Sequence, residues 1–197
     1  MTATSTPLDG MDTSQVEMME ELCLCLDEND NVIDSSSKLT THYGEGIRHR
    51  AFSVLIFDSN DRLLVQQRST DKITFPGVWA NSCCSHPLNI AGENGDAVEG
   101  VIQAARRKLD QELGIPENVT NDWQFNHIGK FEYKCRWDQD WVEHEIDHVL
   151  IVRADCETNH NRNEIQAIDW LDRNALSEMM ERKGRWKSQL IAPWFEA

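Results

Sequence analysis

The segment DAVEGVIQAARRKLDQELGIP, residues 96–116, carries the clearest structural signal in the chain and predicts an amphipathic helix. Its apolar residues recur at the spacing that places them on one helix face: Val98, Val101, Ile102, Ala105 and Leu109. Asp96 and Glu99 form a capping-box pattern at the start, where side chains accept hydrogen bonds from free backbone amides. Gly114 and Pro116 mark the end, because glycine favours the helix C-cap conformation and proline cannot continue a helix.

Strand patterns precede this helix. Leucines alternate with cysteines over residues 22–26, and the turn-forming run DENDN leads into Val32 and Ile33, which predicts a β-hairpin. Residues 49–58 have the apolar run of a buried strand. Residues 62–68 follow after a short turn, so we expect them to pair back antiparallel on that strand.

The rest of the chain alternates between loops and further elements. Residues 35–46 are polar and are expected to form a loop, and residues 70–87 an irregular segment with a short strand. The second half predicts strands over residues 123–135, 141–154 and 165–171, a helix over residues 173–183 and a short final segment from residue 188. This order indicates one α+β domain with a mixed β-sheet over residues 21–197. Residues 1–20 are rich in Thr, Ser and Met and are expected to form a flexible arm.

The composition limits the classes of function. The chain has 197 residues with 34 acidic and 19 basic side chains, and its net charge is −15. Such a surface repels the nucleic-acid backbone and anionic lipid, so neither is an expected partner. There is no apolar run of the roughly 18 residues that a transmembrane helix needs, and no signal peptide. The six cysteines lack the spacing of a disulfide scaffold, which indicates the cytoplasm, and we expect a monomer.

Candidate metal ligands occur in three separate parts of the chain: His42, His49, His86, Glu143 and Glu145. The two glutamates are two positions apart in a predicted strand, so their carboxylates share one face. Imidazoles and carboxylates together suit a divalent ion such as Mg²⁺, Mn²⁺ or Zn²⁺. The same pattern is also typical of a solvated acidic strand face, which Asp147 would continue.

Three basic residues bracket the first long strands: Lys38, Arg68 and Lys72. A diphosphate needs several such donors, because its oxygens accept hydrogen bonds from ammonium and guanidinium groups. In a strongly acidic chain, a local cluster of cations would favour an anionic substrate. Ordinary surface charge is the alternative for each of the three.

The run NSCCSHP, residues 81–87, places two cysteines side by side, with His86 two positions after the second. A metal site, a reactive thiol, half of a disulfide and core packing are all compatible with this run. A zinc knuckle would need a second Cys/His pair at suitable spacing, and none follows. Neighbouring residues of an extended segment face opposite ways, so we expect one of Cys83 and Cys84 to pack in the core and the other to be functional.

The end of the predicted helix resembles the Nudix signature REUxEExGU, in which U is an aliphatic residue. The matching residues are Arg107, Leu109, Glu112, Gly114 and Ile115. Lys108 and Gln111 stand where the signature has glutamates that gather metal ions for hydrolysis. The resemblance therefore implies a Nudix-like fold whose hydrolytic site is largely dismantled.

The separated motifs of the chain together resemble the type I isopentenyl diphosphate isomerase family. They are TFPGVWANSCCSHP at residues 74–87, the altered Nudix box, WVEHEID at residues 141–147 and PWF at residues 193–195. The resemblance runs from about residue 22 to residue 195. It implies a Nudix-like mixed β-sheet sandwiched by helices, with an N-terminal extension, and Cys84 and Glu145 as catalytic residues.

Carried over position by position, the resemblance also implies the rest of the site. A site for Mn²⁺, Mg²⁺ or Zn²⁺ would be formed by His42, His49, His86, Glu143 and Glu145. Glu112 would hold a Mg²⁺ ion that accompanies the substrate diphosphate. The substrate contacts would be Lys38, Arg68, Lys72, Ser85, Tyr133 and Trp194.

The implied reaction interconverts isopentenyl and dimethylallyl diphosphate, which supplies prenyl units for isoprenoid biosynthesis. Moving a double bond by one carbon adds a proton at one carbon and removes one at another, so a thiol and a carboxylate serve as the acid–base pair. The face of a tryptophan would stabilise the intervening carbocation and exclude water. Which of Cys84 and Glu145 donates the proton stays open.

Two other functions stay open as alternatives. A Nudix diphosphohydrolase would release phosphate or a monophosphate, although Lys108 and Gln111 argue against it. A non-catalytic metal-binding interaction domain would bind metal without turnover. Many members of the resembled family continue with a further helix beyond PWF, whereas this chain stops at Ala197. We therefore expect the lid of the pocket to be shorter or to be supplied by the N-terminal arm.

Overall fold

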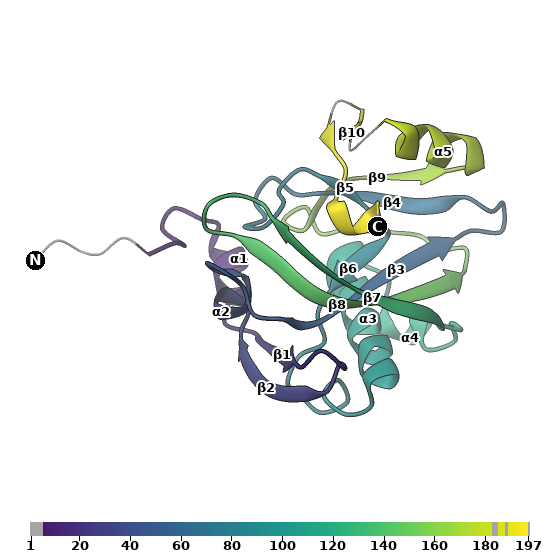
Figure 1. The fold of residues 1–197 in the computed structure, drawn as a ribbon. Helices are drawn as coiled ribbons and strands as arrows, with labels where there is room; N and C mark the ends of the chain where they lie inside the picture. Colours follow the sequence, from purple (N-terminus) through teal and green to yellow (C-terminus); the bar gives the residue numbers. More distant parts are fainter. Residues whose placement is uncertain (1–5, 183–184, 188, 197) are drawn as a thin grey trace, which may run out of the picture.

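The computed structural model describes residues 6–182, 185–187 and 189–196 (Figure 1). Within these residues the chain forms a mixed sheet of nine strands and a separate two-stranded hairpin, with helices packed against the large sheet. This arrangement confirms the predicted α+β class. None of the helices in the described ranges is long and apolar enough to cross a membrane.

The elements have the following bounds. The large sheet contains β1 (Leu22–Leu26), β2 (Val32–Ser37), β3 (His49–Phe57), β4 (Leu63–Arg68), β5 (Trp79–Ala80), β6 (Cys83–Ser85), β7 (Asn126–Arg136), β8 (Val142–Arg153) and β9 (Ile165–Leu171). The small hairpin consists of β10 (Arg185–Trp186) and β11 (Gln189–Leu190). The helices are α1 (Thr13–Met18), α2 (Lys38–His42), α3 (Ala97–Leu113), α4 (Glu117–Thr120) and α5 (Arg173–Glu181), followed by the 3-10 turn η1 (Pro193–Phe195).

Strand β3 lies at the centre of the large sheet. It pairs in parallel with β8 along its whole length and antiparallel with β6. Strand β7 extends the sheet beyond β8. Strand β4 meets β3 at a single pair, Phe57 with Leu63, and has β9 as its long antiparallel partner. The expectation that residues 62–68 pair back on the preceding strand therefore holds only beside the turn.

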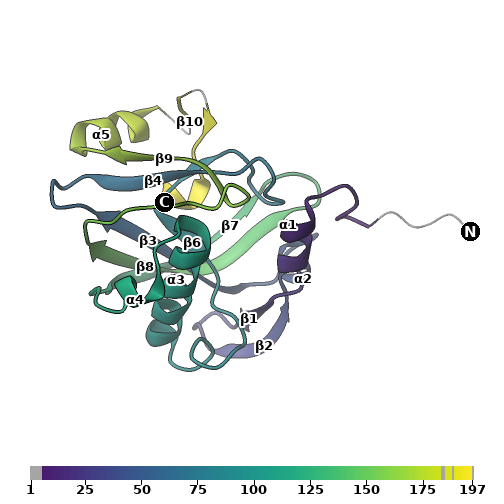
Figure 2. The same ribbon diagram turned by 180° about the vertical axis from the view of Figure 1, so that it is seen from behind.

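Helix α3 occupies the position that the sequence predicts. Asp96 accepts hydrogen bonds from the amides of Val98 and Glu99, and Gly114 ends the helix at a φ of +66°. A Cβ atom at Gly114 would lie 2.4 Å from the carbonyl oxygen of Asn159, so a larger residue would not fit. Figure 2 shows α3 in front of the sheet, where it packs against β3, β6 and β8.

The register of β3 and β6 separates two faces of the sheet. Cys83 pairs with Val54, and Cys84 pairs with Ser53. Because alternate residues of a strand point to opposite faces, these two pairs lie on opposite sides. Val54 and Cys83 are fully buried in the core against α3. Ser53 and Cys84 lie on the other face, together with Glu145, whose strand β8 runs parallel to β3.

The segment of residues 35–46, expected as a loop, contains regular structure instead. Strand β2 extends to Ser37 because residues 35–37 pair with β1. The Ser37 side chain then accepts a hydrogen bond from the amide of Thr40 and caps α2. Three half-buried serines at the end of an edge strand and a helix of five residues leave no hydrophobic periodicity to detect. The end of the last predicted helix, at residue 183, lies outside the described residues.

The N-terminal arm also contains a regular element. Residues 1–5 lie outside the described part of the chain, but α1 is a short helix capped by Asp12. Gln15 is 4% exposed and Met19 is 3% exposed, because both pack against the domain. Polar contacts of Gln15 and apolar contacts of Met19 with Ile73 and Trp141 attach this stretch to the domain.

Candidate active site

A pocket lies beside the sheet face that carries Cys84 and Glu145. It is lined by Gln15, Met19, Lys38, Arg68, Lys72, Ile73, Thr74, Cys84, Ser85, His86, Glu112, Tyr133, Glu143, Glu145 and Trp194. The pocket thus brings together the catalytic pair and all six substrate contacts that the resemblance implied. His42 and His49 lie behind it and are fully buried. Gln15 and Met19 agree with the expectation that the N-terminal arm helps to cover the pocket.

Three histidines and two glutamates converge at one side of this pocket, and their ligand atoms all lie within 4.8 Å of one another. His42 Nε2 lies 2.8 Å from Glu143 Oε2. Glu145 Oε1 lies 2.8 Å from His86 Nε2 and 3.4 Å from His49 Nε2. Glu143 and Glu145 are 4% and 5% exposed, so the alternative of a solvated acidic strand face is wrong.

Backbone carbonyls orient two of the imidazoles. His42 Nδ1 lies 2.8 Å from the carbonyl oxygen of Lys38, and His49 Nδ1 lies 2.7 Å from that of Ile47. A carbonyl oxygen only accepts hydrogen bonds, so each Nδ1 carries a hydrogen, and in the neutral form of each ring the Nε2 lone pair faces the cluster. These two Nε2 atoms and Glu143 Oε2 are buried without a hydrogen-bond partner among the described residues. Such a set of buried acceptors fits a divalent metal ion.

The charges of the cluster are strongly coupled. Burial raises the pKa of Glu145, but interactions led by that with the nearby His49 outweigh this effect and lower the pKa to about 2. Burial lowers the pKa of His49, and Glu145 in turn raises it above its ordinary value. Burial and the neighbouring His49 and His42 lower the pKa of His86 well below its usual range. Glu145 is therefore ionised, and His86 is a neutral imidazole that can act as a ligand.

Tyr133 fixes the second oxygen of Glu145. The two residues are paired across β7 and β8, and Tyr133 Oη donates to Glu145 Oε2 at 2.5 Å. Burial and the charge of Glu145 raise the pKa of Tyr133 well above its ordinary value, so the phenol keeps its proton. One carboxylate thus faces histidines with one oxygen and a phenol with the other.

The adjacent cysteines have different environments, as the alternation predicted. Cys83 is buried in the core, with Sγ 3.8 Å from Glu112 Oε2. Cys84 lines the pocket, and its Sγ lies 3.8 Å from Arg68 Nη1. Burial raises the pKa of Cys84 to about 12, with Arg68 opposing the shift. The pocket therefore contains a neutral thiol that has a proton to donate.

Cations from three segments meet at the pocket. Arg68 donates from Nε to the carbonyl oxygen of Phe75 and from Nη2 to that of Thr74, at 3.0 and 2.9 Å. Lys72 Nζ lies 2.5 Å from Glu164 Oε2. Lys38 enters from the start of α2. Because the loop carbonyls hold the guanidinium in place, this part of the pocket is organised for an anion before one binds.

An aromatic wall borders the same space. The Trp194 ring lies 5.1 Å from that of Phe75 and 6.1 Å from that of Tyr133, measured between centroids. Trp194 is 6% exposed and packs with Val78 and other buried residues. The guanidinium of Arg68 lies 5.7 Å from the Trp194 ring centroid. The pocket thus combines a cationic region with an apolar one, which suits an amphiphilic ligand.

The altered Nudix box forms a buried ion pair at the end of α3. Lys108 Nζ lies 3.1 Å from Glu112 Oε1, and both side chains are buried. Burial opposes the charge of Lys108, but Glu112 raises its pKa above the ordinary value. A lysine thus occupies a position where the Nudix signature has a metal-gathering carboxylate.

Some residues of the site leave no signal in the sequence. Gln15 and Met19 lie outside the recognised motifs, yet both line the pocket. Glu164 is 4% exposed and pairs with Lys72, although it belongs to no motif. An acidic residue directly before a predicted strand is a weak hint, because most such residues are solvated.

Comparisons with known proteins agree with this geometry. Residues 47–195 match the NUDIX domain family. Isopentenyl-diphosphate delta-isomerase idi1 of Aspergillus fumigatus is 43% identical over 98% of this chain and 73% of its own length. Isopentenyl-diphosphate Delta-isomerase 1 of Bos taurus is 40% identical over 95% of this chain and 85% of its own length.

A solved structure shows the same fold. DR0079 from Deinococcus radiodurans is 16% identical, with a TM-score of 0.63 over 89% of this chain and 95% of its own. At this identity the likeness concerns the fold alone, and the NUDIX domain match confirms the predicted Nudix-like architecture. The matched domain and the relatives at about 40% identity lead to one conclusion. The chain belongs to the isopentenyl-diphosphate delta-isomerase family, built on a Nudix domain.

Proposed function

We propose that this protein interconverts isopentenyl and dimethylallyl diphosphate and so supplies prenyl units for isoprenoid biosynthesis. The observation that carries the proposal is a single pocket that joins three cations, an aromatic wall and the pair Cys84 and Glu145. The cations match a diphosphate, the aromatic wall matches a short prenyl chain, and the pair matches a proton shift. The relatives named isopentenyl-diphosphate delta-isomerase support the same reaction.

The substrate lies with its diphosphate against Lys38, Arg68 and Lys72, and the hydroxyl of Ser85 adds a further donor. Its prenyl chain lies toward the rings of Tyr133 and Trp194. Isopentenyl diphosphate has its double bond between C3 and C4, and dimethylallyl diphosphate has it between C2 and C3. This orientation carries the reacting carbons past the cations to the thiol and the carboxylate.

The residues of the pocket account for the proton balance. One proton is added at C4 and one is removed from C2, so the composition of the substrate does not change. Cys84 holds a proton that burial retains, and Glu145 is an ionised acceptor. The Trp194 ring stabilises the positive charge that develops at C3 between the two transfers, and the aromatic wall keeps water away from it. The bond to the diphosphate stays intact throughout.

Two metal positions belong to the proposal. His42, His49, His86, Glu143 and Glu145 would hold Mn²⁺, Mg²⁺ or Zn²⁺, and Glu112 would hold a Mg²⁺ ion accompanying the diphosphate. When bound, these ions supply positive charge that tunes the proton affinity of Glu145 and neutralises the diphosphate. We also propose a cytoplasmic location, because all six cysteines lie in the described residues as free thiols. The protein is proposed to act as a monomer.

The test is to incubate the purified protein with isopentenyl diphosphate and Mg²⁺ and to follow the products by proton NMR. The expected result is dimethylallyl diphosphate without release of phosphate, with loss of activity after chelation and recovery when metal is restored. Phosphate or monophosphate release would instead assign a Nudix diphosphohydrolase. Metal binding without either reaction would leave a metal-binding interaction domain.

A further inference from the structure

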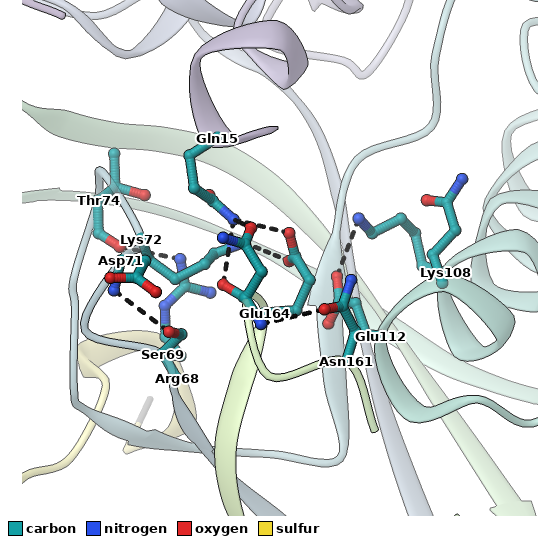
Figure 3. A network of polar contacts seen from close by, with 12 residues as sticks. Gln15, Arg68, Ser69, Asp71, Lys72, Thr74, Lys108, Glu112, Asn161 and Glu164 are labelled. Carbon is teal, nitrogen blue, oxygen red and sulfur yellow. Dashed lines mark hydrogen bonds and ion pairs between the residues drawn. The ribbon is translucent and has the colours of Figure 1, made fainter. Parts of the chain in front are cut away.

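Glu164 is a buried acid whose position suggests a role behind the pocket. It directly precedes β9, and its side chain is 3% exposed. Its Oε2 lies 2.5 Å from Lys72 Nζ, and its Oε1 accepts a hydrogen bond from Gln15 Nε2 at 2.9 Å (Figure 3). Glu164 does not line the pocket in the described part of the chain, whereas Lys72 and Gln15 do. Any influence of Glu164 on a ligand therefore passes through these neighbours.

The backbone of Glu164 fixes the loop that carries Lys72. The amide of Ser69, at the start of this loop, donates to the carbonyl oxygen of Glu164 at 2.9 Å. The amide of Lys72 donates to the carbonyl oxygen of Ser69 at 3.3 Å. Figure 3 shows the Lys72 side chain extending from this loop toward Glu164. Glu164 thus binds the start of the loop through its backbone carbonyl and the Lys72 ammonium through its side chain.

We propose that Glu164 is a positioning residue for diphosphate binding, because its carboxylate holds the Lys72 ammonium in the place from which it contacts the substrate. This inference rests on the proposed function of the pocket as a diphosphate site. A lysine ammonium has three N–H donors, so the bond to Glu164 leaves two for phosphate oxygens. The long, flexible lysine side chain then loses little further entropy when the substrate binds.

Charge is the second part of the same role. The charged groups that act most strongly on Lys72 are Glu164 before β9, Arg68 on β4, Lys38 on α2 and Glu112 on α3. Burial lowers the pKa of Lys72, and the charges of Arg68 and Lys38 lower it further. Glu164 gives the largest opposing effect, ahead of Glu112. Without the charge of Glu164, Lys72 would lose its proton at a lower pH.

Helix α1 holds the carboxylate in its orientation. Gln15 Nε2 also donates to Asn163 Oδ1 at 2.7 Å, and Asn163 Nδ2 donates to Asp12 Oδ1 at 2.9 Å. With Gln15 bound to Oε1, the other oxygen of Glu164 faces Lys72. The hydrogen bonds of Gln15 thus attach α1 to the domain and also orient the Glu164 carboxylate.

The first test compares Glu164→Gln with Glu157→Gln. The substitution Glu164→Gln keeps the shape of the side chain and removes its charge, and Glu157 is an exposed control on the same connection between β8 and β9. Two quantities are measured across pH: the Kd of inorganic diphosphate with Mg²⁺ by calorimetry, and kcat and KM for isopentenyl diphosphate. We expect Glu164→Gln to raise Kd and KM roughly tenfold, equivalent to about 1.4 kcal/mol, with a much smaller change in kcat.

The pH profile and a double variant separate this role from a structural one. In Glu164→Gln, the alkaline limb of kcat/KM should move to lower pH, and Glu157→Gln should match the wild type. In a Lys72→Met background, Glu164→Gln should cause no further loss of diphosphate affinity, because the residue through which it acts is gone. The inference would be overturned if Glu164→Gln left the alkaline limb of kcat/KM unchanged. It would also be overturned if Glu164→Gln lowered the diphosphate affinity as much in the Lys72→Met background as in the wild type.

A second variant covers the case in which Glu164→Gln does not fold. Glu164→Asp keeps the charge and shortens the side chain by one methylene, so it should weaken diphosphate binding while keeping the wild-type alkaline limb. Full diphosphate affinity in Glu164→Asp would contradict the positioning role. The calorimetry also separates this inference from the proposed function. If the protein binds inorganic diphosphate through Glu164 and Lys72 but does not isomerise isopentenyl diphosphate, only the proposed function is contradicted.

Discussion

Cys83 and Cys84 are neighbours in the chain but belong to opposite faces of one sheet. Pairing with Val54 directs Cys83 into the core against α3, and pairing with Ser53 directs Cys84 to the pocket. The alternation of a strand is enough to expect such a division, but not its direction. The direction follows from the register with β3, which also places Glu145 on the face of Cys84.

This division gives a prediction for matched substitutions of two adjacent residues. Cys83→Ala should lower the free energy of unfolding by roughly 1–2 kcal/mol, because it leaves a small cavity in a fully buried core. Cys84→Ala should change the stability by less than Cys83→Ala, since Cys84 is only half-buried. Urea unfolding of both variants measures the difference, and a larger stability loss in Cys84→Ala than in Cys83→Ala would contradict the assigned faces.

Among the elements, the hairpin of β1 and β2 is tied to the sheet by its turn. Asp30 Oδ1 accepts from Arg50 Nε at 2.8 Å, and Asp30 Oδ2 accepts from Lys130 Nζ at 2.8 Å. His148 Nε2 lies 2.9 Å from the same Oδ2. These partners come from β3, β7 and β8, so one carboxylate links the turn to three strands. Burial raises the pKa of Asp30, but these partners outweigh burial and lower it below its ordinary value.

Asp30→Asn should therefore destabilise the protein and reduce its response to acid. Removing one partner of a buried charged cluster costs about 3–5 kcal/mol. Because the folded pKa of Asp30 is lowered, its stabilising effect is complete above the unfolded pKa of about 3.9 and is lost as the pH falls below it. Urea unfolding between about pH 5 and pH 2 should show a shallower decline for Asp30→Asn than for the wild type.

Asp61→Asn is the matched control. Asp61 also has a positive φ, +58° against +69° for Asp30, and asparagine tolerates this conformation. Its partner Arg153 is 68% exposed, whereas Arg50 is 3% exposed, so the Asp61 pair is worth about 0–1 kcal/mol. If Asp30→Asn and Asp61→Asn lowered the free energy of unfolding equally, the burial of the Asp30 cluster would not determine its contribution to stability.

Elements with strong local patterns were predictable, and elements held by distant polar contacts were not. Helix α3 has its cap at Asp96 and its stop at Gly114, and β9 has the bounds expected from its apolar run. Helix α1 has six residues and is held by Gln15, which contacts Glu164, 149 positions away. No local periodicity reports such a contact, so neither helix α1 nor the role proposed for Glu164 could be inferred from the sequence.

In the molecule as a whole, the sheet around β3 has one face for stability and one for the site. The face toward α3 buries an apolar core, and the opposite face carries Cys84, Glu143 and Glu145. The family resemblance implied the site residues, and six of them implied as substrate contacts line one pocket. What the resemblance could not supply is how each group is held, such as the carbonyl oxygens that orient His42 and His49.

The central claim is that Cys84 and Glu145 add one proton to the substrate and remove another. The reaction of isopentenyl diphosphate in deuterated buffer tests this claim most directly. For the wild type, NMR should show deuterium entering the new methyl group of dimethylallyl diphosphate, with no phosphate released. In Cys84→Ala both the product and the label should fall by at least about 100-fold, the range for loss of a general acid or base. Product formation by Cys84→Ala at the wild-type rate would contradict the assignment of Cys84 to proton transfer.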